Sequence, residues 1–79
     1  MRRYTVLLYP SEDCYVAVVP AFGDLATQGA TVEEALLMAK DLIEVAARGL
    51  VEDGEEVPVE ETPPMIASVA ATVPEPATA

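Results

Sequence analysis

Apolar residues gather in short blocks over the first third of the chain, and these blocks predict β-strands. Residues 3–9 are rich in β-branched and aromatic side chains and end at Pro10, which lacks the N–H needed to continue a ladder. After a polar loop, residues 15–19 form a second block that ends at Pro20. The short separation predicts an antiparallel hairpin. A shorter third strand is expected over residues 25–28.

Neither of the first two predicted strands alternates cleanly between apolar and polar residues. Val6–Leu8 and Val16–Val19 are uninterrupted apolar runs. Such runs are typical of a sheet that is covered on both faces. One helix covers only one face, so we expect the C-terminal segment or a second copy of the chain to cover the other.

The segment from Val32 to Leu50 has the periodicity of a long amphipathic helix, with apolar residues at i, i+3 and i+4. Thr31 is the expected N-cap, and Glu34 is expected to reach back to the amide of Thr31 in a capping box. On the polar side, Glu44 and Arg48 form an expected i, i+4 ion pair. We therefore predict that this helix packs with its apolar side on the sheet.

The order of these elements predicts an α+β fold, a three-stranded antiparallel sheet (β-β-β-α) with one long amphipathic helix on one face. We place a domain at residues 1–62, a further strand or an arm at 63–73, and a disordered tail at 74–79. Gly29 is expected to supply the turn before the helix. Gly54 or Gly49 is expected to end the helix in the left-handed conformation.

Three apolar residues fall on or beside the polar side of the predicted helix. Leu37 lies among charged positions, while Met38 and Val45 border the apolar stripe. They either widen the core and include one exposed leucine, or form a contact patch for a second subunit or a partner protein.

The chain of 79 residues has the size of one small domain, which buries about 60% of the surface of its unfolded chain. One cysteine closes no internal disulfide, and the absence of histidine removes the ordinary zinc site. Small folds without these supports depend on good packing or oligomerisation. We expect a homo-oligomer, either a dimer or a tetramer.

The formal charge of −10, from 14 acidic and 4 basic residues, disfavours direct binding of nucleic acid. Its electrostatic complement is a basic protein, although the same charge also serves solubility. The expected partner-binding residues come from the most acidic segment and from the first loop: Glu52, Asp53, Glu55, Glu56, Ser11, Glu12 and Asp13.

No catalytic signature accompanies Ser11, Ser68 or Cys14, and without histidine each would need another base. The first two strands carry no acidic residue for a metal cluster. We therefore expect a protein that is not an enzyme and that holds no cofactor or metal. No apolar run approaches the ~20 residues of a membrane helix, and no signal-peptide pattern opens the chain, so we expect a cytoplasmic protein.

Several short motifs occur in a fixed order between Arg3 and Val59. They are Pro20-x-Phe22, Thr27-Gln28-Gly29, Thr31-x-Glu33-Glu34-Ala35 and Asp53-Gly54-Glu55-x-Val57-Pro58. In this order, and together with the two strands, they resemble the HicB-like antitoxin domain of prokaryotes.

The resemblance implies a partial ribonuclease H-like fold and a small basic HicA-type ribonuclease toxin as the partner that is bound and neutralised. The C-terminal DNA-binding domain usual in such antitoxins is not expected here, because the residues after Pro58 are few and poor in Lys and Arg. The alternative is an orphan homo-oligomeric structural or regulatory domain without a toxin, binding a small ligand in a groove between subunits.

Overall fold

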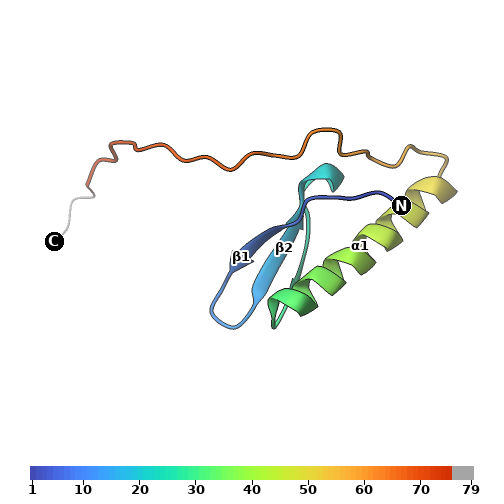
Figure 1. The fold of residues 1–79 in the computed structure, drawn as a ribbon, viewed down its shortest axis with the longest axis horizontal. Coiled ribbons are helices and arrows are strands. Elements are labelled where there is room, and N and C mark those ends of the chain that lie inside the picture. Colours follow the sequence, from blue (N-terminus) through green and yellow to red (C-terminus); the bar gives the residue numbers. More distant parts are fainter. Residues whose placement is uncertain (76–79) are drawn as a thin grey trace.

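The computed structural model describes residues 1–75, which form a three-stranded antiparallel sheet with one long helix on one face (Figure 1). This confirms the predicted α+β fold. The elements are β1 (Leu7–Pro10), β2 (Tyr15–Val19), the 3₁₀ turn η1 (Pro20–Phe22), β3 (Leu25–Gly29) and α1 (Val32–Glu52).

Strand β2 lies at the centre of the sheet and pairs antiparallel with both neighbours. The predicted hairpin is confirmed, with Leu7 opposite Val18 and Pro10 opposite Tyr15. The first strand begins at Leu7, not at residue 3. Its ladder partner ends one residue further on, because β2 stops at Val19 and gives way to the η1 turn at Pro20, which has no N–H to donate.

Tyr9 and Tyr15 lie on neighbouring strands, one on each side of the β1–β2 loop. These residues are not opposite each other: Tyr15 packs against the core, whereas Tyr9 is 54% exposed. The aromatic pair is instead Tyr4 with Phe22, whose rings meet edge to face with centroids 5.0 Å apart. It joins the N-terminal segment to η1.

The helix begins as a modified capping box. As predicted, the Glu34 amide donates to the Thr31 hydroxyl, at 3.0 Å. The predicted bond from the Thr31 amide to the Glu34 side chain is wrong, because the carboxylate accepts from the Ala30 amide at 2.7 Å. The carboxylate thus accepts from an amide one residue further from the helix than in the usual capping box. This bond also fixes the backbone that leads into the helix.

Gly29 does not supply a turn, contrary to expectation. It is a buried residue of β3, and a Cβ at this position would lie 2.8 Å from the Cα of Ala35. The left-handed positions before β3 are Gly23 (φ 67°) and Asp24 (φ 61°). Gly29 is therefore required for the close approach of the first turn of α1 to the sheet.

The helix ends in a Schellman motif at Gly54, which confirms one of the two glycines proposed for this role. Gly54 is left-handed (φ 72°), and its amide donates to the Val51 carbonyl at 3.1 Å. The Glu55 amide donates to the Leu50 carbonyl at 2.8 Å. Gly49, the other glycine proposed, lies inside α1, which continues to Glu52, and so does not end the helix.

The core is built from small side chains. Ala17 and Val19 of β2 and Ala35 and Ala39 of α1 are fully buried. Small residues on both surfaces let the helix and sheet approach closely, but they enclose little apolar area. A ring of partly buried side chains completes the core: Tyr4, Val6, Leu8, Tyr15, Phe22 and Ile43.

The sheet face opposite α1 is apolar. Because side chains alternate along a strand, Leu7, Val16 and Val18 lie on the opposite face from Ala17 and Val19. No helix or strand within residues 1–75 packs on this face.

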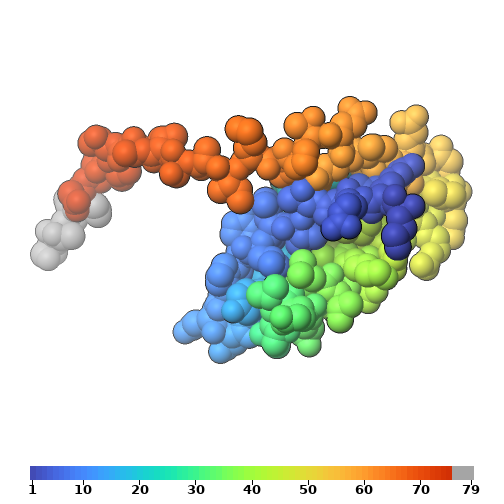
Figure 2. All heavy atoms as spheres, viewed as in Figure 1, coloured from blue at the N-terminus to red at the C-terminus, as the bar shows by residue number. Residues whose placement is uncertain are grey.

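After α1 the chain returns beside the N-terminal residues and then leaves the domain (Figures 1 and 2). Every residue from Glu61 to Glu75 is exposed, and no strand forms between residues 53 and 75. The expected strand or arm over residues 63–73 is thus an extended arm. Of the tail predicted at 74–79, residues 76–79 lie outside the described residues.

Candidate protein-interaction site

Four carboxylates surround the C-terminal end of α1. Glu52, Asp53, Glu55 and Glu56 are all exposed, and the last turn of the helix carries no basic residue. The free carbonyls at a helix C-terminus also place a partial negative charge there. We call these four residues the acidic helix end, and it concentrates negative potential in one place.

This placement is locally unfavourable. Carboxylates at a helix C-terminus oppose the macrodipole, where a lysine or arginine would stabilise it. Within residues 1–75 the four side chains form no hydrogen bond or ion pair that would offset this cost. The fold does not use these carboxylates, so they are available to a partner.

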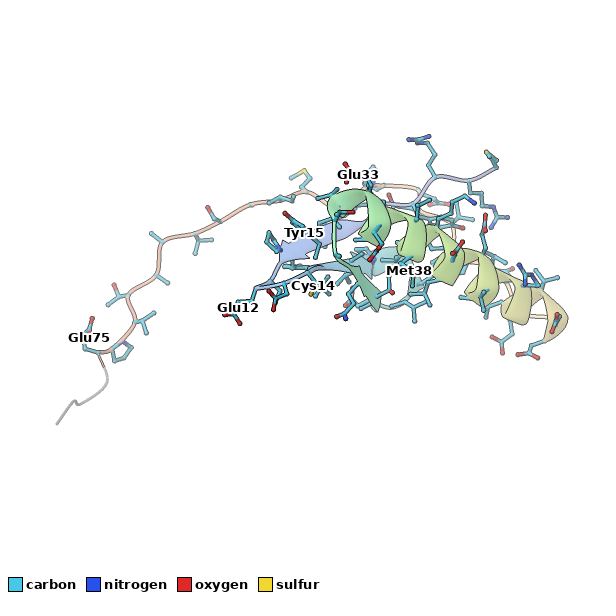
Figure 3. The ribbon with its side chains drawn as sticks, turned by 90° about the horizontal axis from the view of Figure 1, so that it is seen from below. Glu12, Cys14, Tyr15, Glu33, Met38 and Glu75 are labelled. Carbon is cyan, nitrogen blue, oxygen red and sulfur yellow. The ribbon has the colours of Figure 1, made fainter. Side chains whose placement is uncertain are left out.

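The second predicted acidic surface lies at the other end of the domain. Ser11, Glu12 and Asp13 are exposed in the β1–β2 loop, where the Ser11 amide donates to the Cys14 carbonyl at 2.8 Å. Glu12 and Cys14 mark this loop in Figure 3. This loop lies toward the N-terminal end of α1, far from the acidic helix end (Figure 1). The structure therefore does not bring the two predicted surfaces together.

Leu37, Met38 and Val45 lie on the outer side of α1, where they are 63%, 44% and 61% exposed. The ion pair on this helix joins Lys40 to Glu44 at 3.1 Å, and the predicted pair of Glu44 with Arg48 does not form. Glu44 has Lys40 one helical turn before it and Arg48 one turn after it, and its carboxylate pairs with Lys40. The role of the three apolar residues as a contact patch stays a prediction.

A groove of about 650 Å³, which the sequence pattern does not reveal, separates the N-terminal segment from α1. Its apolar lining includes Val6, Leu36 and Ile43. Leu36 falls on the apolar side of the helical period, four residues after Val32, yet it is 43% exposed. The close approach at Gly29 sets α1 against β3 and β2, which leaves the β1 side open.

The root of the arm is tied to the N-terminal segment. Glu60 accepts from the Thr5 amide at 2.8 Å and from its hydroxyl at 2.5 Å, and the Tyr4 hydroxyl donates to the Pro58 carbonyl at 2.6 Å. Arg2 also donates to the Val57 carbonyl. These partners are 54 or 55 residues apart in the chain, so no local pattern predicts them.

Groups for metal or covalent chemistry do not converge in the part of the chain that the structure describes. No three His, Cys, Asp or Glu side chains lie close enough there to hold a metal ion. The thiol of Cys14 lies 3.9 Å from the side-chain oxygen of Gln28, with no basic group as its partner. Among residues 1–75, no helix combines the length and apolar character needed to cross a membrane.

Comparison with known proteins gives one informative relative. No family model matches the chain, and no solved structure matches it significantly. Over 57 residues the chain is 39% identical to UPF0150 protein Ta0767 of Thermoplasma acidophilum. The match covers 71% of this chain and 83% of that protein. Because it extends over most of both proteins at this identity, the chain belongs to the UPF0150 family.

Proposed function

We propose that the chain is a HicB-like antitoxin-type domain that binds a small basic HicA-type ribonuclease toxin and neutralises it without catalysis of its own. The observation that carries the proposal is the acidic helix end: four exposed carboxylates at a negative helix terminus, without a compensating cation in the last turn. Membership of the UPF0150 family is consistent with it.

The motifs that resemble the HicB-like domain occupy structural positions that set its shape. Pro20-x-Phe22 forms η1, Thr31 caps α1, and Gly54 ends it. Together they position the long helix, and hence its acidic end, relative to the sheet. The resemblance therefore rests on residues that build the fold and present the candidate surface.

Charge gives the physical basis of inhibition. A ribonuclease holds the phosphates of its substrate with basic side chains, so its RNA-binding surface is electropositive. An array of carboxylates on a rigid helix end attracts such a surface and competes with phosphates for the same cations. We place this encounter in the cytoplasm, where an RNA-cleaving partner meets its substrate.

The test is to immobilise the chain, capture a small basic protein from the native lysate at low salt, and then measure its binding to charge variants. Reversal of Glu52, Asp53, Glu55 and Glu56 to lysine is expected to slow association by about tenfold or more and to flatten its salt dependence. The folded state should persist, because lysines at a helix C-terminus favour the dipole.

Reversal of Glu12 and Asp13 to lysine tests the other predicted acidic surface, at the opposite end of the domain. We expect a smaller loss of association rate, because two charges change there and the helix begins near this loop, so its positive end offsets them. If the helix-end variant associated as fast as the unmodified chain, the acidic helix end would be excluded as the binding surface.

The alternative function is a homo-oligomeric structural or regulatory domain without a toxin. The exposed apolar arm favours it, because Met65, Ile66 and Val69 are 86–91% exposed and suit self-association. Recovery of the chain with itself alone in the capture experiment would support this alternative over the toxin inhibitor.

A further inference from the structure

The arm carries an apolar stripe on one side. Between Pro64 and Pro74 lie nine residues without proline, all exposed. In an extended chain, alternate residues share a side. One side then consists of Met65, Ala67, Val69, Ala71 and Val73, all apolar, and the other of Ile66, Ser68, Ala70 and Thr72. Such one-sided alternation is typical of a strand with one face against a core.

The domain to which this arm belongs does not bury the stripe. Met65 is 91% exposed, Val69 86% and Val73 76%. The stiff Pro63-Pro64 pair, which follows the clamped root at Glu60, directs the chain away from the domain (Figures 1 and 2). A contiguous exposed apolar segment of this kind indicates an interaction site.

The domain also offers a place for an added strand. Within residues 1–75, β1 pairs with β2 only, so the backbone groups on its outer edge are open to pairing. The groove begins next to the start of β1, where Val6 of the N-terminal segment faces Leu36 and Ile43 of α1 across it. A strand on this edge with an apolar side toward α1 would fill the groove.

The charges of the groove and of the arm are complementary. Arg2, Arg3 and Lys40, three of the four basic residues of the chain, line the groove together with a single carboxylate. The apolar stripe is flanked by Glu61 on one side and Glu75 on the other. An arm in the groove would therefore bring acidic flanks to a basic rim in an otherwise acidic protein.

From these observations we infer that two copies of this chain exchange arms. Residues 65–73 of each copy add to the outer edge of β1 of the other, with Met65, Ala67 and Val69 in the groove between the N-terminal segment and α1. The exchange is reciprocal, so each copy gives one arm and receives one. This inference does not depend on the proposed toxin.

The first test is the mass of the full-length chain in solution by light scattering after size-exclusion chromatography. We expect the mass of a dimer for the unmodified chain. Val69→Asp places a charge in the apolar stripe and should weaken dimerisation by about tenfold or more. Thr72→Asp adds the same charge to the other side of the arm and should leave the dimer intact.

Both substitutions lie in the exposed arm, so neither endangers the fold. A monomer at all concentrations for the unmodified chain would overturn the inference, as would equal effects of Val69→Asp and Thr72→Asp. A dimer that Val69→Asp leaves intact would assign the interface to another surface, such as Leu37, Met38 and Val45, and would also overturn it.

A cross-link separates exchange from folding back within one chain. In a Cys14→Ser background, chains with Leu36→Cys are mixed with chains with Val69→Cys, and a short thiol-to-thiol cross-linker is added. Covalent dimers of the two different chains are the expected product. If a chain carrying both cysteines instead cross-linked only within itself, as a monomer, the arm would fold onto its own groove and the exchange would be refuted.

Discussion

At the scale of single residues, two glycines of the same chain have opposite roles. Gly29 is buried in β3, where any side chain would meet the backbone of Ala35. Gly49 lies within α1 with no atom close to the position of its missing Cβ. One glycine sets the distance between helix and sheet, and the other only adds flexibility to the unfolded chain.

We therefore predict opposite signs for the same substitution. Gly29→Ala should lower the free energy of unfolding by about 1–3 kcal/mol, because the first turn of α1 must move away from the sheet. Gly49→Ala should raise it by about 0.5–1 kcal/mol, since alanine is the better helix former and the space is open. Urea unfolding of both variants checks the pair, and a neutral Gly29→Ala would contradict the close approach.

At the scale of elements, β1 is the least supported strand. It has four residues and one neighbour, and the segment before it is held by the root of the arm through Glu60 and Thr5. The bonds join residues 55 positions apart, and the loop that they close contains the helix and all three strands. They couple the N-terminal segment to the direction in which the arm leaves.

Loss of this clamp should loosen the N-terminal segment. Glu60→Ala removes both bonds to Thr5 and should lower the free energy of unfolding by about 1 kcal/mol. The Thr5 amide should also exchange faster with solvent hydrogen. Glu61→Ala, at the adjacent exposed position, is the matched control and should change neither quantity. Unchanged exchange at Thr5 in Glu60→Ala would show that the clamp does not hold the segment.

Local sequence patterns predict most of the secondary-structure elements. The features that they do not predict depend on contacts between distant parts of the chain. The Thr31 cap, the hairpin and the end at Gly54 depend on neighbours within a few residues, so the sequence predicts them. The shortened β1 and the role of Gly29 depend on what lies opposite in space. The bond of Glu60 to Thr5 joins residues 55 positions apart, which no periodicity encodes.

Across the molecule as a whole, the buried core is small, whereas the exposed surface carries strongly charged and apolar regions. Four fully buried side chains hold the helix to the sheet. One end of the domain is strongly acidic, a groove opens between the N-terminal segment and α1, and an apolar arm extends from the domain. The charge of the acidic segment was predictable from composition. Its separation from the Ser11–Asp13 loop was not, because only the three-dimensional fold places the two at opposite ends.

We propose that this domain neutralises a basic ribonuclease through its acidic helix end. The most direct test measures RNA cleavage by the captured small basic protein as the chain is added. Cleavage is expected to fall to background at stoichiometric amounts of the chain. The variant with lysines at positions 52, 53, 55 and 56 is expected to leave cleavage largely intact. Full cleavage in the presence of the stable, stoichiometric complex would overturn the proposal.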